Sequence, residues 1–480
     1  MMRSKKVVNA LLFLDVYERN AFGKFLQSPY FNSNQAAVTY FQIIDGCIRN
    51  ERYDLDDTQI WDQVYPQTTY EHQKFLKLNS DLVKLLESYL VQQELAKEPS
   101  IAANLKLKAA HRHNITPLIN GIIGEVDRLT KLDNNRSGQY FYNRFQLELS
   151  QFNTTTENEK KKSKFEIEAQ LNIAQISGHL DNFYAIEKLR MYCTLLSWKK
   201  MYQLNTELSH IDFALEIAKE HDHKEIPAVK LYYLMQATYN SPDDTKFYFE
   251  LRDLMKASLH LFPESEAKEI YSTAISYCIN QVNRGNLEFQ RETFELYKEF
   301  YNQNYFYSTE SISETSFRNI VQIGLRVNEF GWAENFIYTY SKYLDPKDKD
   351  NAVYFSLARL EFYRKNYNLV IEYLNNVTYE DVWYSLGSKA LLLHSYYELG
   401  EYDALESLLQ SFNMYVRREK SLTKDRKSHQ HNLIRFTTIL MRLNHKEKAK
   451  LQALKDEVQN TKGVVSKPWL LEKIQEKIEK

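Results

Sequence analysis

The scarcity of turn-forming residues constrains this chain more than any other feature. Only 12 of its 480 residues are glycine and 9 are proline, whereas 35 are tyrosine and 26 are phenylalanine. Glycine and proline together make up about 12% of an average protein, and folds built from many short strands need them at their tight turns. The composition therefore excludes β-sandwiches, barrels and propellers, and it predicts an all-α protein of long helices joined by short loops.

Apolar periodicity predicts four regions along the chain. A polar segment without apolar periodicity, residues 153–164, is the clearest linker. The predicted regions are a small N-terminal helical domain (1–98), connecting helices (99–152), a helical repeat array (165–445) and C-terminal capping helices (446–480).

The N-terminal domain is expected to contain short helices at about residues 5–18, 20–27 and 35–50, followed by a longer one that ends near Lys97. Ser28-Pro29 breaks the chain, because proline disfavours helical backbone in the residue before it. The string KFLQSPYFN, from Lys24 to Asn32, resembles the N-terminal segment of uncharacterised bacterial helical-repeat proteins. That resemblance implies no activity.

Three short segments recur at equal spacing in the C-terminal half. Their aromatic residues Trp332, Tyr367 and Tyr402 fall 35 residues apart twice in succession, and each lies between two apolar helical stretches. The chain here resembles tetratricopeptide repeats, which are helix-turn-helix units of about 34 residues. The best match covers about residues 316–412. The resemblance implies an α-solenoid of antiparallel helix pairs.

In a tetratricopeptide-like stack, the first helices of the pairs line a concave face that binds a protein or peptide. An arginine beside tyrosine rings could hold an acidic or C-terminal segment through charge-assisted hydrogen bonds. Alternatively, Phe355 and Phe362 belong only to the core between repeats and Arg359 is a solvated charge. The resemblance places Phe355, Arg359, Phe362 and Tyr363 in one repeat and Ala390, His394, Tyr397 and Glu398 in the next on this face, and we take Phe355, Arg359, Tyr363, His394 and Tyr397 as candidate partner-binding residues.

One basic stretch stands out in a chain whose net charge is −1. Residues 417 to 450 contain eleven lysines and arginines and only three acidic residues. The stretch forms either a solvated outer face of a packed helix or a contact with phosphate backbones or an acidic partner. Its candidate nucleic-acid-binding residues are Arg417, Arg418, Lys424, Arg426 and Lys427.

Motifs for cofactors and metals are absent from the sequence. It contains neither the glycine-rich phosphate-binding loops nor the helical His-Glu-x-x-His pattern. Histidines two residues apart point away from each other on a helix, so such pairs are expected on loops or solvated faces. These pairs are His111/His113, His221/His223 and His429/His431. We therefore expect no catalytic residue, cofactor or metal.

The remaining features indicate a cytoplasmic scaffold or adaptor. Cys47, Cys193 and Cys278 are odd in number and far apart, which fits buried thiols in a reducing compartment. No run of eighteen apolar residues occurs, so no membrane span is expected. The preferred function is non-catalytic binding of a protein partner, and the alternative is nucleic-acid binding or regulation through the basic stretch.

Overall fold

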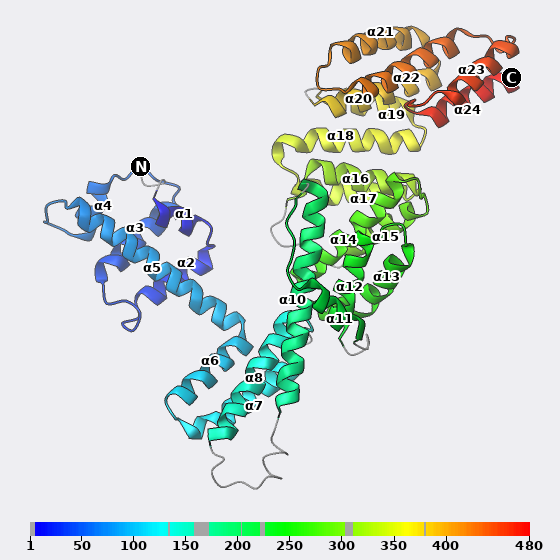
Figure 1. The fold of residues 1–480 in the computed structure, drawn as a ribbon. Coiled ribbons are helices and arrows are strands. Elements are labelled where there is room, and N and C mark those ends of the chain that lie inside the picture. The colour runs from blue at the N-terminus through cyan, green and yellow to red at the C-terminus, as the bar shows by residue number, and fades with distance from the viewer. Residues whose placement is uncertain are drawn as a thin grey trace. The chain divides into compact units, whose positions relative to one another are not determined.

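A computed structural model describes residues 5–132, 135–157, 172–202, 204–220, 226–302, 311–378 and 381–480. Within these ranges the chain forms helices and turns but no strand, which confirms the predicted all-α class (Figure 1). None of the helices in these ranges has the length and apolar character needed to cross a membrane. The chain divides into a first unit, Met1–Gln236 with Asp253–Pro263, and a second unit, Ala237–Arg252 with Glu264–Lys480.

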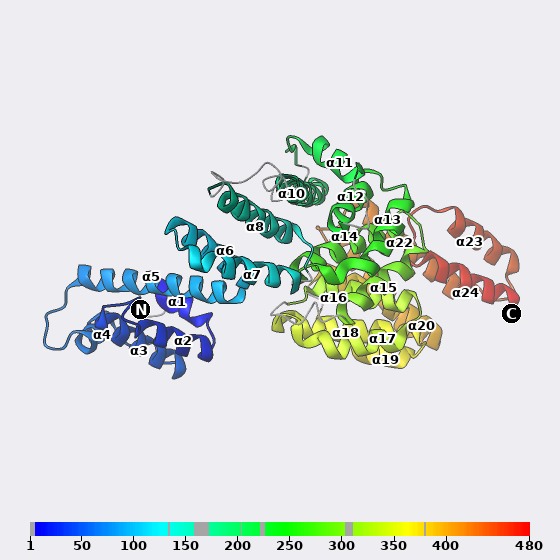
Figure 2. The same cartoon turned by 90° about the horizontal axis from the view of Figure 1, so that it is seen from below.

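The first unit begins with five helices around one core. The long helix α5 lies alongside α1, α2 and α3 (Figure 2). Phe22, Trp61 and Phe75 are among its fully buried side chains. The helices of the first unit are α1 (Lys6–Leu12), α2 (Val16–Leu26), α3 (Gln35–Arg49), α4 (Asp57–Val64), α5 (His72–Lys97), α6 (Pro99–Arg112), α7 (Thr116–Leu132), α8 (Gly138–Glu157), α10 (Ile173–Tyr202) and α11 (Ile211–Glu220).

Two predicted boundaries differ from the structure. The helix expected over residues 5–18 is interrupted at Asp15, whose carboxylate accepts the amide of Glu18 while the Glu18 side chain accepts the amide of Asp15. This reciprocal cap starts a new helix. The expected linker 153–164 begins inside α8, and residues 158–171 lie outside the described part of the chain.

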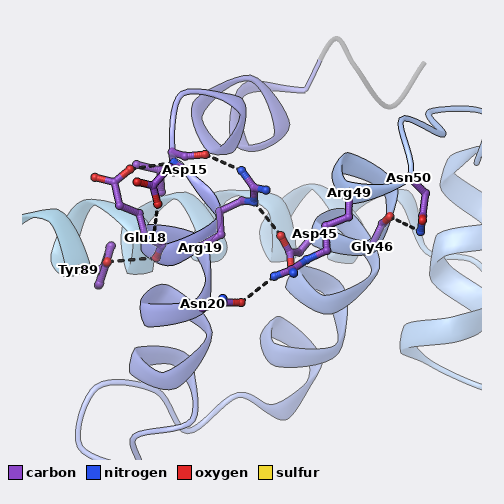
Figure 3. A network of polar contacts seen from close by, with 10 residues as sticks. Asp15, Glu18, Arg19, Asn20, Asp45, Gly46, Arg49, Asn50 and Tyr89 are labelled. Atoms are coloured by element: carbon purple, nitrogen blue, oxygen red, sulfur yellow. Dashed lines mark hydrogen bonds and ion pairs between the residues drawn. The ribbon is translucent and has the colours of Figure 1, made fainter. Parts of the chain in front are cut away.

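An ion-pair network joins α2 to α3 (Figure 3). Arg19 Nε lies 2.7 Å from Asp45 Oδ1, and Arg49 Nε lies 2.7 Å from Asp45 Oδ2. The side chains of Arg19 and Asp45 are only 8% and 14% exposed, whereas that of Arg49 is 40% exposed. One carboxylate therefore has a buried cation and an exposed cation as partners.

The difference in burial predicts different costs for two similar substitutions. Arg19→Met should lower the free energy of unfolding by about 3 kcal/mol, because it leaves a buried carboxylate short of a partner. Arg49→Met should cost less than about 1 kcal/mol, because exposed ion pairs contribute little. Urea denaturation followed by circular dichroism measures both, and equal losses would contradict the assigned role of burial.

The second unit contains the helices of the proposed repeats. Helix α18 packs against its successor α19 and also against α16 and α20 (Figure 1). Helices α12 (Pro227–Asn240) and α13 (Thr245–Ser258) contain the division between the units, inside the range predicted for the array. The remaining helices are α14 (Glu264–Asn283), α15 (Phe289–Asn302), α16 (Glu314–Arg326), α17 (Phe330–Tyr340), α18 (Pro346–Tyr363), α19 (Tyr367–Leu374), α20 (Val382–Leu399), α21 (Tyr402–Arg418), α22 (Lys424–Arg442), α23 (Lys448–Asn460) and α24 (Lys467–Glu479).

The turns that follow α14, α16, α18 and α20 share one backbone geometry, which we call the joint. In each joint one residue has a left-handed backbone, and the amide of the next residue donates to the carbonyl five residues before it, over 2.9–3.0 Å. This is the Schellman arrangement, which satisfies the last carbonyls of a helix. The left-handed residues are Gly285, Asn328, Lys365 and Gly400, with φ of 98°, 63°, 61° and 75°.

The joints revise the register of the repeat. Asn328, Lys365 and Gly400 are separated by 37 and then 35 residues. Counted from the joints, Phe330, and not Trp332, occupies the place of Tyr367 and Tyr402 at the start of the second helix. The alignment based on equally spaced aromatic residues therefore placed the first helix pair, α16 and α17, two residues out of register.

Left-handed backbone predicts opposite effects for two identical substitutions. Gly400→Ala should lower the free energy of unfolding by about 1 to 2 kcal/mol, because an L side chain is strained at its φ of 75° although the space around it is open. Gly331→Ala, inside helix α17 and also in open space, should raise it by up to about 1 kcal/mol. Thermal unfolding of the two variants checks this, and a shared sign would contradict it.

Candidate functional site

Two adjoining cavities open between helices of the second unit. The main cavity, about 500 Å³, lies among α16, α18, α20 and the turn before α24. The side cavity, about 290 Å³, lies among α14, α15 and α16. Asn319 lines both, so they are neighbours. Among the described residues, no aspartate or glutamate lines either cavity.

The contact between α18 and α20 forms one wall of the main cavity. A Cβ atom at Gly387 would come within 2.7 Å of Phe355 Cζ, so only glycine allows the ring to lie against the α20 backbone. Phe355 also meets Tyr384 edge to face, with ring centroids 5.1 Å apart. Phe355 is 5% exposed, and it belongs to the packing of the two helices while its edge lines the cavity.

Arg359 lies one helical turn beyond Phe355 and lines the main cavity. Its guanidinium lies 5.6 Å from the centre of the Phe355 ring, and it has no ion pair or hydrogen bond with any described residue. Burial, together with the positive charges of Arg326 and Arg318, lowers the pKa of Arg359 to about 10. Arg359 remains charged at neutral pH, but it is a cation with little solvent and no counter-ion among the described residues.

Two further arginines complete what we call the arginine cluster: Arg318, Arg326 and Arg359. The Arg318 side chain is 17% exposed, lies 3.6 Å from a carboxylate oxygen of Glu314, and faces the Tyr384 ring at 4.7 Å. Its Nε has no hydrogen-bond partner among the described residues. Arg326 lines the side cavity. Arg318 and Arg359 thus line one cavity, Arg326 lines the adjoining one, and the positive charges of Arg318 and Arg326 both act on Arg359.

Other polar groups at the cavities also lack partners among the described residues. Both ring nitrogens of His394 and Oε1 of Gln430 are buried at the main cavity, and Oε1 of Gln322 is buried at the side cavity. Burial lowers the pKa of His394 to about 3, so its imidazole is neutral. Because most buried polar groups in proteins are hydrogen-bonded, these atoms are available to a molecule that enters the cavities.

Helix α24 covers the next part of the α20 face. The Trp469 ring lies 4.2 Å from His394 and 5.3 Å from Tyr397, between ring centroids. Trp469 Nε1 donates to Glu398 at 2.9 Å, and Lys473 Nζ lies 3.1 Å from the same carboxylate. Tyr397 and Glu398 therefore contact the protein's own C-terminal helix, whereas Arg359 and Tyr363 line an open cavity.

One of the predicted basic residues, Arg426, contacts a residue that lines the main cavity. Arg417 and Arg418 end α21, while Lys424, Arg426 and Lys427 lie in the first turn of α22. The guanidinium of Arg426 lies 4.5 Å from the centre of the Trp383 ring, and Trp383 lines the main cavity while remaining 49% exposed. The two sets of candidate residues thus meet at Trp383.

The structure brings four of the five candidate partner-binding residues together: Phe355, Arg359, Tyr363 and His394 line the main cavity, and Tyr397 lies beside it under Trp469. Sequence reasoning missed Arg318, Arg326 and Trp383. The joints carry a signal for Arg326, which lies two residues before Asn328 as Tyr363 lies two residues before Lys365. The sequence contains no comparable signal for Arg318 or Trp383.

Metal and thiol chemistry have little support in the described residues. No group of three or more histidine, cysteine, aspartate or glutamate side chains there can hold a metal ion. His111 and His113 lie at the end of α6 and His429 and His431 on α22, while His221 and His223 lie outside the described residues. Cys47, Cys193 and Cys278 are buried and form no disulfide with any described residue, and burial raises the pKa of Cys278 to about 12.

Neutral, buried His394 predicts a pH dependence of stability. Its pKa is about 3 when folded and 6.5 in an unperturbed state, so the unfolded chain binds an additional proton as the pH falls below 6.5. Stability is complete above pH 6.5, and this histidine should remove about 2 kcal/mol by about pH 5. Urea denaturation at both pH values should show that His394→Phe abolishes this part of the loss. An unchanged loss would contradict the burial of the neutral ring.

Comparison with known proteins leaves the assignment to the site itself. No protein-family model, curated protein or solved structure matches the chain. The chemistry of the two cavities is therefore the basis for a functional proposal.

Proposed function

We propose that this chain is a non-catalytic scaffold or adaptor that binds an acidic segment of a protein partner in the main and side cavities. The observation that carries the proposal is the arginine cluster, because it lines two cavities whose described lining residues include no acid. A carboxylate-bearing segment supplies the missing negative charge and accepts charge-assisted hydrogen bonds.

The proposal includes an α-solenoid of antiparallel, tetratricopeptide-like helix pairs. The repeated joint and the contacts of α18 with both α16 and α20 support it. In such an array the first helices of successive pairs line a common face. Arg326, Tyr363 and Glu398 each lie two residues before a joint, so they occupy matching positions on that face.

The size and lining of the cavities favour a peptide segment. Cavities of about 300 to 1,000 Å³ hold small ligands or several side chains, and the main and side cavities measure about 500 and 290 Å³. Phe362, Tyr363 and Trp383 offer apolar ring surface beside the arginines. The site can therefore hold a short segment that combines a negative charge with apolar side chains.

The titratable groups at the cavities favour binding over proton transfer. General acid–base catalysis is most effective when the pKa of the catalytic group lies near the working pH. Burial instead sets the pKa of His394 to about 3 and that of Arg359 to about 10. Near neutral pH His394 therefore stays neutral and Arg359 stays charged, and such fixed protonation states suit recognition.

Nucleic-acid binding through the basic stretch is the weaker candidate. Several of its cations already have acidic neighbours: Arg435 lies 2.7 Å from Glu457, Arg442 3.7 Å from Glu406 and Lys450 2.7 Å from Glu447. These pairs interrupt the row of charges that a phosphate backbone would follow. Arg426, in contrast, extends the positive charge of the main cavity at its Trp383 edge.

A peptide array gives a direct test of the proposal. We expect the full chain to bind peptides that combine glutamate or aspartate with an aromatic residue, and not their lysine-substituted counterparts. Arg359→Gln should weaken the binding about tenfold or more, because a charge-assisted contact in a buried site is lost. Fluorescence anisotropy with the best peptide measures the affinity.

The control is Lys349→Gln, which removes an exposed charge from the same helix and should change the affinity by less than about twofold. Binding that Arg359→Gln leaves unchanged would contradict the proposed site. Salt-sensitive retention of RNA or DNA, lost when Arg417, Arg418, Lys424, Arg426 and Lys427 are neutralised, would favour nucleic-acid binding instead.

A further inference from the structure

The arginine cluster carries more positive charge than a single carboxylate neutralises. Among the described residues the cluster has one ion pair, between Arg318 and Glu314 at 3.6 Å. Two positive charges therefore remain without a partner among the described residues lining the cavities. Arg318 and Arg359 line the same cavity, Arg326 lines the cavity that shares Asn319 with it, and both Arg318 and Arg326 repel the charge of Arg359.

A phosphate monoester fits this surplus better than a carboxylate does. It carries about 1.5 to 2 negative charges at neutral pH and offers three acceptor oxygens. Arginine is the preferred partner of phosphate because its planar guanidinium donates two parallel hydrogen bonds. The unpartnered Nε of Arg318 supplies a further donor at the main cavity.

The cavity also offers a place for the group that carries the phosphate. The Arg318 side chain is only 17% exposed, so a bound phosphate must reach inward. Phe362, Tyr363 and Trp383 present rings along the same cavity. Aromatic rings pack favourably against each other and against arginine. An aryl group is therefore long enough to carry the phosphate inward, and its ring can pack against the rings that line the cavity.

We infer that the arginine cluster binds the phosphate of a phosphotyrosine side chain on the partner segment, with the aryl ring held against the aromatic wall of the main cavity. This inference rests on the proposed function and names the chemical group that the site recognises.

Matched small probes separate charge from shape. Phenyl phosphate and phenyl sulfate have nearly the same shape, but the first is a dianion near pH 7.5 and the second a monoanion. Calorimetric titration of the full chain should show phenyl phosphate binding at least about tenfold more tightly, because the second charge meets an unpaired guanidinium. Inorganic phosphate should bind more weakly than phenyl phosphate, because it lacks the ring.

Two variants test the location. Arg359→Gln should remove most of the preference for phenyl phosphate over phenyl sulfate, while Lys349→Gln should keep it. Circular dichroism and an unchanged unfolding temperature exclude misfolding as the cause, and Arg359→Lys, which retains the charge, should recover part of the preference. Equal binding of the phosphate and the sulfate, or equal binding of inorganic and phenyl phosphate, would overturn the inference.

Peptide versions of the probes distinguish the inference from the proposed function. The same acidic peptide is made with tyrosine, phosphotyrosine or phosphoserine at one position. The phosphotyrosine peptide should bind most tightly. If the acidic peptide binds and Arg359→Gln abolishes the binding, but phosphorylation gives no gain, the inference fails and the proposed function stands. If no form binds, both fail.

Discussion

The packing of α18 between α16 and α20 shapes the main cavity of the second unit. The Phe355 ring lies against the α20 backbone at Gly387, and this close approach holds the following turn of α18 beside the same two helices. Arg359 lies on that turn, so its guanidinium is held where solvent is limited and where Arg318 and Arg326 already contribute positive charge. An apolar contact thus brings like charges together.

Such an arrangement lowers the stability of the unbound protein, and a ligand of opposite charge would remove that cost. Like charges in a poorly solvated site repel each other, and buried donors without acceptors cost free energy. The nearby α20 face shows the other solution, because Trp469 and Lys473 of α24 satisfy Glu398 within the chain. The same row of helices therefore has one part that the protein covers itself and one part that remains open. We interpret the open part as the binding site.

Apolar periodicity in the sequence predicted the helical class and individual helices such as α5 and α18, because that pattern is local. The tetratricopeptide resemblance also pointed to Arg359, Tyr363 and His394, which line the main cavity, while their role in binding stays a prediction. The predicted register of the first helix pair was wrong, because it was set by the aromatic residues. The left-handed residues Asn328 and Lys365, which mark the true register, carry no distinctive side chain. The contact of Trp469 with His394 joins residues far apart in the chain, which periodicity does not reveal.

The most direct test of the account is the chemical reactivity of Arg359 towards a dicarbonyl reagent, whose carbonyl carbons are attacked by the neutral form of the guanidine. Because burial and neighbouring charge lower the pKa of Arg359 to about 10, it should be modified faster than the more exposed Arg417 and Arg418, as measured by peptide mass spectrometry. An acidic aromatic peptide should protect it. Slower modification of Arg359 than of Arg417 and Arg418 would contradict an open cavity with an unpaired arginine.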